Sequence, residues 1–342
     1  MVEIETLEGP LESTRLKWVA DLYGPVDPKY RDRAQLEHLF VNVPAAPALH
    51  AFALDASRPV GHCAIVPMTA RHGNRAFLAG KVEALVVDEA YRGRLGRSPP
   101  VALRLREALY ESADARGIEL LHAYVRPEVG RILDLVPLHV AARSFVAVLK
   151  PSSVAARRLR APAIALSLGQ ATLRAGVGAV VGSKAAVERA PTTADGDLVR
   201  APAPPEGRWT VLAEDAWDWY SAAPSVRVLE LDNRGDSRAL VQMPGSPGDA
   251  IRLVAWRTES PSLTSALRAV RAAAQFATST GAGTLRYQPW QHGPGGDVLV
   301  GACRLLGLVR RDGFATINVR ARDPALARPE SVISTPLLAL GF

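Results

Sequence analysis

Cysteine is scarce in this chain of 342 residues, which contains only Cys63 and Cys303. The two lie far apart, each within an apolar run, so we expect buried, reduced thiols rather than a disulfide. No Cys-x-x-Cys pair and no cluster of histidine and cysteine occurs in the sequence. These absences argue against a disulfide scaffold and predict no metal site.

The chain also lacks the segments that would direct it into or across a membrane. Residues 1–11 are acidic and have no apolar core, which is not the pattern of a signal peptide. The apolar stretch at residues 163–182 contains Gln170, Arg174 and several glycines, which argue against a membrane span. We therefore expect a cytoplasmic protein with no transmembrane segment. We interpret residues 163–182 as a helix docked on a domain face, with an interfacial or partner-binding helix as the alternative.

Length and charge limit the classes that remain. The chain is longer than one hydrophobic core usually supports, which predicts two domains. Its composition, 48% hydrophobic and 22% charged, is that of a globular protein. The net charge of +7 favours a polyanionic partner such as a coenzyme A phosphate, a nucleic acid or an anionic membrane. Arginine-rich and alanine-rich usage also follows from genomic base composition, so both interpretations stay open.

The first half of the chain has the alternation of an α/β domain. The pattern predicts short helices at residues 15–23 and 34–40, a β-hairpin of residues 49–54 and 60–66, and a strand at 77–87. A helix that begins at Ser98 and Pro99 ends at Gly117, and residues 118–125 form the next strand. Strand, loop, helix and strand in this order form the core of an α/β unit.

The second half repeats this order of elements. The pattern predicts a hairpin at 226–231 and 239–243, a strand at 251–256, a helix at 263–278, a strand at 284–288, a helix at 298–306 and a strand at 314–319. Residues 152–190 indicate one or two helices, and residues 191–207 a linker with little regular structure. We therefore predict an α/β fold with mixed sheets, in which domains at 1–150 and 207–342 are joined by a helical and proline-rich linker at 151–206. Two unrelated α/β domains are the alternative to a tandem repeat.

Residues 81–97, KVEALVVDEAYRGRLGR, carry the most informative pattern. An apolar strand leads through a short acidic turn to a loop rich in glycine and arginine, which enters a helix. Such a loop can point backbone N–H groups at a phosphate, and the helix dipole adds positive potential. Arg92, Arg94 and Arg97 add positive charge. The Gly-x-Gly-x-x-Gly dinucleotide fingerprint and the Walker pattern are both absent.

This segment resembles motif A of the GNAT acyltransferases. The resemblance rests on Leu85, Val87, Tyr91, Arg92 and Gly93 and extends, with the flanking hairpin, helix and strand, over about residues 15–150. It implies that acetyl-CoA or another acyl-CoA binds with its pyrophosphate on the loop amides and its pantetheine arm along the strand. The implied cofactor contacts are Leu85, Val86, Val87, Arg92, Gly93, Arg94, Leu95, Gly96, Arg97 and Ser98.

The match to motif A is incomplete. Leu95 stands where the family has a glycine, and Arg97 where it has glycine or alanine, although a shift of one residue would restore Gly96 as the phosphate-facing glycine. Residues 126–140 lack the tyrosine or asparagine that is usual in the next helix. The second half keeps no Arg-Gly-x-Gly loop, so we expect a degenerate second GNAT-like domain.

Acyl transfer to an amine needs a base for the ammonium proton and can use an acid for the leaving thiolate. Strand alternation predicts that Glu83 shares a face with Leu85 and Val87. In the GNAT acyltransferases this part of the strand often supplies the base, so the resemblance implies that Glu83 is the base. His122 and Tyr124 share a face of the next strand, which makes His122 an alternative base and Tyr124 a candidate acid. For each residue, an ordinary packed side chain is the alternative.

The resemblance as a whole implies a tandem GNAT protein that transfers an acetyl or longer acyl group to an amine of a small metabolite, an amino sugar or a peptide. Two alternatives stay open. The substituted loop would suit a non-catalytic ligand-binding or scaffold protein, and the basic charge would suit a Fem-like transferase that uses aminoacyl-tRNA. No DNA partner is expected.

Overall fold

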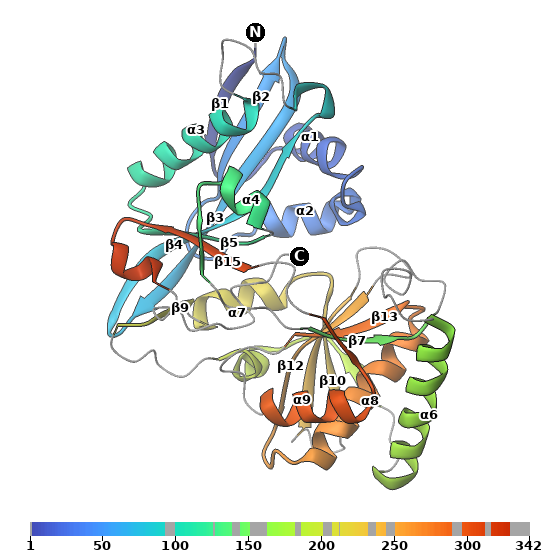
Figure 1. Cartoon of the computed structure of the whole chain (residues 1–342). Coiled ribbons are helices and arrows are strands. Elements are labelled where there is room, and N and C mark those ends of the chain that lie inside the picture. The colour runs from blue at the N-terminus through green and yellow to red at the C-terminus, as the bar shows by residue number, and fades with distance from the viewer. Residues whose placement is uncertain are drawn as a thin grey trace. The chain divides into compact units, whose positions relative to one another are not determined.

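The computed structural model describes residues 2–92, 100–125, 127–138, 144–150, 163–181, 186–200, 207–211, 213–231, 237–243, 250–288, 296–311 and 316–328. They form two compact units, each built on one mixed β-sheet (Figure 1). The first unit comprises Met1–Val140, Ala201–Pro224 and Ala315–Phe342, and the second comprises Ala141–Arg200 and Ser225–Phe314.

The sheet of the first unit has the strand order β1-β2-β3-β4-β5-β15-β6, and β9 pairs with β3. All neighbours are antiparallel except β4 and β5, which are parallel. The strands are β1 (Glu3–Glu8), β2 (Leu49–Asp55), β3 (Arg58–His72), β4 (Arg75–Val87), β5 (Leu120–Val125), β6 (Val136–Leu138), β9 (Trp209–Val211) and β15 (Thr316–Ala321).

Helices cover both faces of this sheet. Along β3, Cys63 and Ile65 belong to the apolar core that contains Leu105 and Leu109 of α3, whereas His62 lies against Tyr23 of α1. Figure 1 shows α3 on one side of β2–β4 and α1 with α2 on the other. The helices of this unit are α1 (Ser13–Tyr23), η1 (Pro28–Arg31), α2 (Arg33–Phe40), η2 (Glu89–Tyr91), α3 (Val101–Ala115), α4 (Pro127–Ile132), α7 (Ala213–Ser221) and η4 (Pro324–Ala327).

The sheet of the second unit has the order β14-β7-β13-β12-β11-β10-β8, and only its β12–β13 pair is parallel. In its core, alanine side chains of α8 pack with larger apolar side chains of the strands and of α9, and α8 contacts β11, β12 and β13. The elements are β7 (Ser144–Val148), α6 (Ala163–Val181), β8 (Val187–Arg189), η3 (Thr193–Leu198), β10 (Val226–Glu230), β11 (Ser237–Gln242), β12 (Ala250–Thr258), α8 (Leu263–Ser279), β13 (Thr284–Tyr287), α9 (Gly296–Leu305) and β14 (Val309–Arg311).

The two halves of the chain exchange strands: β9 and β15 join the first sheet, and β7 joins the second. β15, from the C-terminal half, pairs with β5 in the first sheet, and β7, from the N-terminal half, pairs with β13 in the second. The units therefore differ from the contiguous domains expected at 1–150 and 207–342: residues 144–148 lie in the second unit, and residues 207–224 and 316–321 in the first. A strand's apolar pattern shows which face it buries but not which sheet it joins.

Most expected elements of the two repeats are present, and both cysteines are buried and free as expected. Residues 191–207, expected to have little regular structure, contain η3, which has a capping box between Thr192 and Asp195. Asp195 is fully buried and accepts hydrogen bonds from Arg189 and Arg238, which fasten η3 to the strands. The sequence patterns also missed the strands β1, β6, β7, β8, β9 and β14. Among the described residues, no helix is long and apolar enough to cross a membrane.

Candidate active site

The parallel strands β4 and β5 separate part-way along their length. Hydrogen bonding joins Ala79–Lys81 of β4 to Leu120–His122 of β5 and ends there, although the two strands continue to Val87 and Val125. The edge of β4 beyond Lys81 therefore has no contact with β5 through its peptide groups. Such groups remain able to pair with an extended ligand.

A β-bulge in β4 lies just past this point. Ala64 pairs with Glu83 and His62 with Val86, so β4 holds one residue more than β3 in this interval. Leu85 and Val87 consequently pack with the apolar core under α3, and Val86 lies opposite His62. The prediction that Glu83 shares a face with Leu85 and Val87 was wrong, because strict alternation does not hold across a bulge.

Glu83 lies in a buried polar cluster on the face away from α3. Its Oε2 atom is 2.6 Å from Nζ of Lys81, and its Oε1 accepts a hydrogen bond of 3.0 Å from the Tyr30 hydroxyl. Lys81 is only 2% exposed and Glu83 6%. Burial, and then the negative charge of Glu83, raise the pKa of Tyr30 well above its ordinary value, so Tyr30 stays a hydrogen-bond donor. Both oxygens of the carboxylate are thus held by donors.

His122 adjoins this cluster, since it pairs with Lys81 across the last parallel step. Its side chain is fully buried, with Nε2 3.4 Å from the Met68 sulfur. Burial chiefly, and then the charge of Lys81, lower its pKa to about 3. His122 is therefore neutral at physiological pH. Tyr124 lies two residues further along β5, at the level that the parallel register would give to Glu83, but pairing with β4 ends at His122. Tyr124 pairs with Ile317 of β15 and is half-buried.

Sequence reasoning missed the tyrosines that complete the cluster. The rings of Tyr23 and Tyr30 are 4.7 Å apart, and the Tyr23 hydroxyl donates to the His62 carbonyl oxygen at 3.1 Å. His62 in turn lies 3.2 Å from His50, with both imidazoles fully buried. No local sequence signal could have found these residues: Tyr30 bonds Glu83 from 53 positions away, and Tyr23 and His50 contact His62 from other elements. Lys81 alone could have been found, two positions before Glu83 on the same strand face.

The expected coenzyme loop is described only at its two ends. At its start, Arg92 donates from Nε to the Val87 carbonyl oxygen at 2.7 Å, and the Tyr91 hydroxyl donates to Asp55 at 2.6 Å. At its end, Pro100 precedes α3, and no described side chain caps this helix. The expected phosphate contacts Gly93, Arg94, Leu95, Gly96, Arg97 and Ser98 lie outside the described residues.

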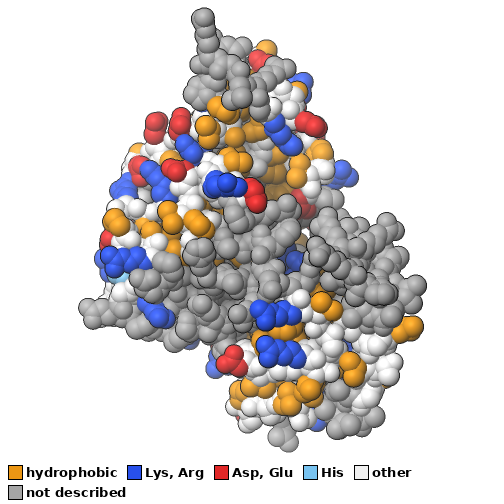
Figure 2. Space-filling view, viewed as in Figure 1, with side chains coloured by type: hydrophobic (Ala, Val, Ile, Leu, Met, Phe, Trp, Pro, Cys, Tyr) orange, Lys and Arg blue, Asp and Glu red, His pale blue; other side chains and the backbone are white. Residues whose placement is uncertain are grey.

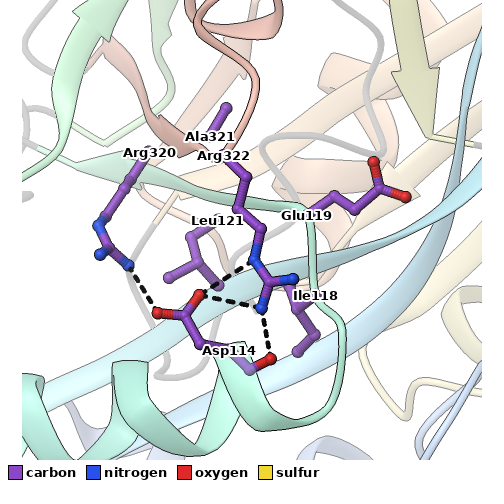
Figure 3. Close-up of a pocket in the computed structure, with 7 residues that line it drawn as sticks. All are labelled: Asp114, Ile118, Glu119, Leu121, Arg320, Ala321 and Arg322. Atoms are coloured by element: carbon purple, nitrogen blue, oxygen red, sulfur yellow. Dashed lines mark hydrogen bonds and ion pairs between the residues drawn. The ribbon is translucent and has the colours of Figure 1, made fainter.

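A cavity of about 250 Å³ lies elsewhere in the first unit, where α3 ends and β5 begins (Figure 3). Arg322 and Arg320 point toward Asp114 there, at 3.2 Å and 3.9 Å. Leu121, which lines the cavity, belongs to the core under α3, so the cavity lies on the other face of the sheet from Glu83. The described part of the chain brings no three metal-ligating side chains together.

Comparisons with known proteins bear on the fold. No family model and no curated protein sequence matches the chain. Saccharomyces cerevisiae N-myristoyltransferase with bound myristoyl-CoA is similar in structure, with a TM-score of 0.61 and 11% identity over 99% of this chain and 85% of that one. A tandem GNAT protein from the clavulanic acid biosynthesis pathway has a TM-score of 0.58 and 12% identity, over 94% of this chain and 99% of that one. A conserved protein from Enterococcus faecalis V583 gives 0.54 and 9%, over 93% and 73%.

This chain has the tandem GNAT fold. The bulge recurs in the second unit, where the extra residue in β12 is Val254. Parallel pairing of β12 with β13 ends there at Leu253 and Tyr287, and β13 itself ends at Tyr287. The helix after the bulged strand differs between the units. Ser262 and Ser265 cap α8 reciprocally, so they occupy N–H groups that a phosphate would need.

Proposed function

We propose that this tandem GNAT protein is an acyl-CoA-dependent N-acyltransferase whose site lies in the first unit. The observation that carries the proposal is the separation of β4 from β5 beside a buried carboxylate, on a strand that leads into the Tyr91-Arg92-Gly93 sequence. A thioester carbonyl would lie where the strands separate, next to the bulge.

The described ends of the loop fit a coenzyme A donor. The edge of β4 beyond Lys81, which does not pair with β5, offers peptide groups to the pantetheine arm, with Leu85, Val86 and Val87 as its neighbours; the Val87 carbonyl oxygen already accepts from Arg92. The first N–H groups of α3 are left without a side-chain cap, and the helix dipole makes that end positive. In our proposal, Arg92 and the Gly93–Ser98 segment place the pyrophosphate there.

Glu83 is the residue to which we assign the acceptor's proton. The amine nitrogen forms a bond to the carbonyl carbon, the carbon–sulfur bond breaks, the ammonium proton passes to the base, and the thiolate takes up a proton. Lys81 favours the ionised carboxylate, so Glu83 can accept a proton only when Lys81 or Tyr30 yields its hydrogen bond. His122 is the alternative base and Tyr124 the candidate acid. Burial disfavours the charged form of His122, which places it second.

One observation favours a second candidate function. Lys81 and Glu83 form an ion pair with each other in the place where a GNAT enzyme would receive its acceptor, and both side chains are almost fully buried. A protein that binds acyl-CoA without transferring the acyl group would suit this arrangement. The acceptor class, whether a small metabolite, an amino sugar or a peptide, is part of the proposal and not fixed by the described residues.

Two measurements on the full chain test the proposal. Calorimetry with acetyl-CoA, myristoyl-CoA and free coenzyme A measures donor binding, and release of the coenzyme A thiol in the presence of a panel of amines measures transfer. Binding with amine-dependent thiol release supports the enzyme. Binding without release on any amine supports the non-catalytic protein, and absence of binding contradicts both.

A further inference from the structure

Lysine is rare in this chain, and one lysine is buried in the candidate site. Of the 41 basic residues, five are lysine and all the others are arginine; the lysines are Lys17, Lys29, Lys81, Lys150 and Lys184. Figure 2 shows basic side chains on the surface of the first unit, among acidic ones, whereas Lys81 is 2% exposed. Arginine keeps its proton in proteins and is the usual residue of a buried ion pair, but lysine can yield a free amine. Lys81 is therefore a candidate nucleophile as well as a counter-ion.

The fold places Lys81 where the two parallel strands separate. Lys81 is the last residue of β4 that pairs with β5, and its partner there is His122, so the two side chains share a face of the sheet. Burial, and then the charge of Lys81, lower the pKa of His122, which shows that the two groups lie near each other. In the proposed function the pyrophosphate lies beyond Val87, and the pantetheine arm runs back along β4. The thioester at the end of that arm would therefore lie toward Lys81.

A carboxylate is in direct contact with this amine. Nζ of Lys81 lies 2.6 Å from Oε2 of Glu83, while the Tyr30 hydroxyl donates to the other oxygen, Oε1, at 3.0 Å. A proton can therefore pass from Nζ to Oε2 along an existing hydrogen bond. The transfer converts two buried charges into a neutral amine and a neutral acid, and burial favours neutral groups over charged ones. The arrangement is that of a nucleophile beside its general base.

We propose that Lys81 is itself an acyl acceptor, so that this protein transfers the acyl group of its donor to its own Nζ. The inference rests on the proposed function, because the donor is the acyl-CoA of that proposal. The ammonium gives one proton to Oε2 of Glu83, the nitrogen forms a bond to the thioester carbonyl carbon, and the carbon–sulfur bond breaks. A second proton passes from the nitrogen to the departing thiolate. The products are an amide, a neutral Glu83 and the coenzyme A thiol, so no buried charge loses its partner.

Self-acylation accounts for the presence of an amine at the place where an acceptor would bind. An external amine has to displace Lys81 from Glu83 before it can give up its proton, whereas Lys81 already lies beside that base. The product is an amide, which is a far weaker acyl donor than a thioester. The reaction should therefore end after one acyl group has been added to each chain.

Mass spectrometry of the full chain, incubated with acetyl-CoA and no added amine, tests this inference. Trypsin cleaves after lysine and arginine but not after acetyl-lysine, so acetylation of Lys81 joins residues 76–81 and 82–92 into one peptide. The same peptide in the chain before incubation gives the starting level. We expect acetylation of Lys81 and release of thiol to approach one per chain.

Lys17 is the matched control within the same molecule. Its Nζ also lies 2.6 Å from a carboxylate, that of Asp21, but 73% of the Lys17 side chain is exposed. Uncatalysed acetylation follows exposure, so it would modify Lys17 before Lys81. We expect the opposite order, with Lys81 acetylated faster by roughly tenfold or more, because only Lys81 has both a bound donor and a buried base. In chains unfolded in urea the two lysines should react at similar rates.

Two variants identify the groups that take part. Glu83→Gln should slow acetylation of Lys81 by ~10²–10⁴ and leave that of Lys17 unchanged, because the amide cannot take up the proton. Lys81→Arg keeps the positive charge but cannot form the free amine, so it should abolish the thiol release that occurs without added amine.

The outcomes separate this inference from the proposed function. If calorimetry detects acetyl-CoA binding but Lys81 is acetylated no faster than Lys17, self-acylation is overturned and the proposed function is not. Absence of acetyl-CoA binding overturns both. Acetylation of Lys81 that is no faster in the folded chain than in the unfolded chain also overturns the inference, and this comparison does not depend on whether a variant folds.

Discussion

Nζ of Lys81 lies 2.6 Å from Oε2 of Glu83, and neither side chain has more than 7% of its surface exposed. Lys17 and Asp21 form an ion pair at the same distance on the surface of α1, with 73% and 60% of the side chains exposed. The two pairs therefore differ in burial and not in length. Burial makes the loss of one partner costly, because the remaining charge has neither water nor its counter-ion.

Lys81→Met should lower the free energy of unfolding by about 3–5 kcal/mol, because the carboxylate of Glu83 is left buried with only Tyr30 as a donor. Lys17→Met, the exposed control, should change it by about 0–1 kcal/mol. The double variant Lys81→Met with Glu83→Gln should recover most of the loss, since no buried charge remains. Denaturant titration followed by tryptophan fluorescence measures all three. A Lys81→Met loss no larger than that of Lys17→Met would contradict the role we give to burial.

Glu83→Gln should lower kcat by ~10²–10⁴ while the affinity for acyl-CoA stays nearly constant, because the amide keeps the shape but cannot accept the proton. The rate should recover partly at high pH, where more of the acceptor is free amine. Thiol-release kinetics across a range of pH measure this, with calorimetry for the donor. Glu119→Gln, which removes a partner of Arg75 on an exposed ion pair, is the control and should leave kcat unchanged. Full activity of Glu83→Gln at neutral pH would pass the assignment to His122 or to water.

Gly93→Val should abolish acyl-CoA binding without unfolding the chain, because a β-branched side chain would stand between the loop backbone and the pyrophosphate. Calorimetry with acetyl-CoA measures the loss, and circular dichroism shows whether the fold is kept. Arg58→Ala is the control, since Arg58 is an exposed residue at the start of β3 that pairs with Asp88. Unchanged affinity in Gly93→Val would remove the coenzyme site from this loop.

Titration of the wild type should give one acyl-CoA per chain. In the second unit, the serine hydroxyls accept from the N–H groups of Ser262 and Ser265 at the start of α8, and Pro261 precedes them with no N–H of its own. Ser262→Ala with Ser265→Ala should leave the affinity of the first site unchanged, because both residues lie in the second unit. A stoichiometry of two in the wild type would show that the second unit has kept a site.

The sequence predicted the fold further than it predicted the site. The order of strands and helices follows from local patterns, and the Tyr-Arg-Gly segment identifies β4 as the strand that leads into the candidate site. The face of Glu83 could not be predicted, because the bulge opposite Cys63 adds one residue to β4 and nothing in residues 83–86 marks it. The contact with Tyr30 comes from a residue 53 positions away, so it depends on packing.

The exchange of β7 and β15 was also beyond the local patterns. The apolar alternation of each strand indicates which of its faces is buried, but it does not indicate which sheet the strand joins. Each strand pairs with an edge that exists only once its sheet has formed: β15 with the edge of β5, and β7 with the edge of β13. A contiguous division into domains is the natural expectation from sequence, and here it misplaces β9 and β15 of the first sheet and β7 of the second.

Stability should fall as the pH is lowered below about 6.5, because buried histidines stay neutral in the folded chain and take up protons only when it unfolds. Burial lowers the pKa of His38 to about 4, below the value of about 6.5 in an unfolded chain. A pKa depressed in the folded state gives stability that is complete above the unfolded value and is lost as the pH falls toward the folded one. His38→Gln should therefore lessen the loss between pH 6.5 and pH 5 by about 2 kcal/mol, at about 1.4 kcal/mol for each pH unit and proton.

The variant also loses the stacking of His38 on Trp219, with ring centres 5.1 Å apart, but that cost is the same at every pH. Gln35→Ala is the matched control, since Gln35 is a buried residue of the same helix that carries no titrating group. Urea titrations at a series of pH values give the slopes, and a slope for His38→Gln equal to that of Gln35→Ala would show that His38 is not protonated on unfolding.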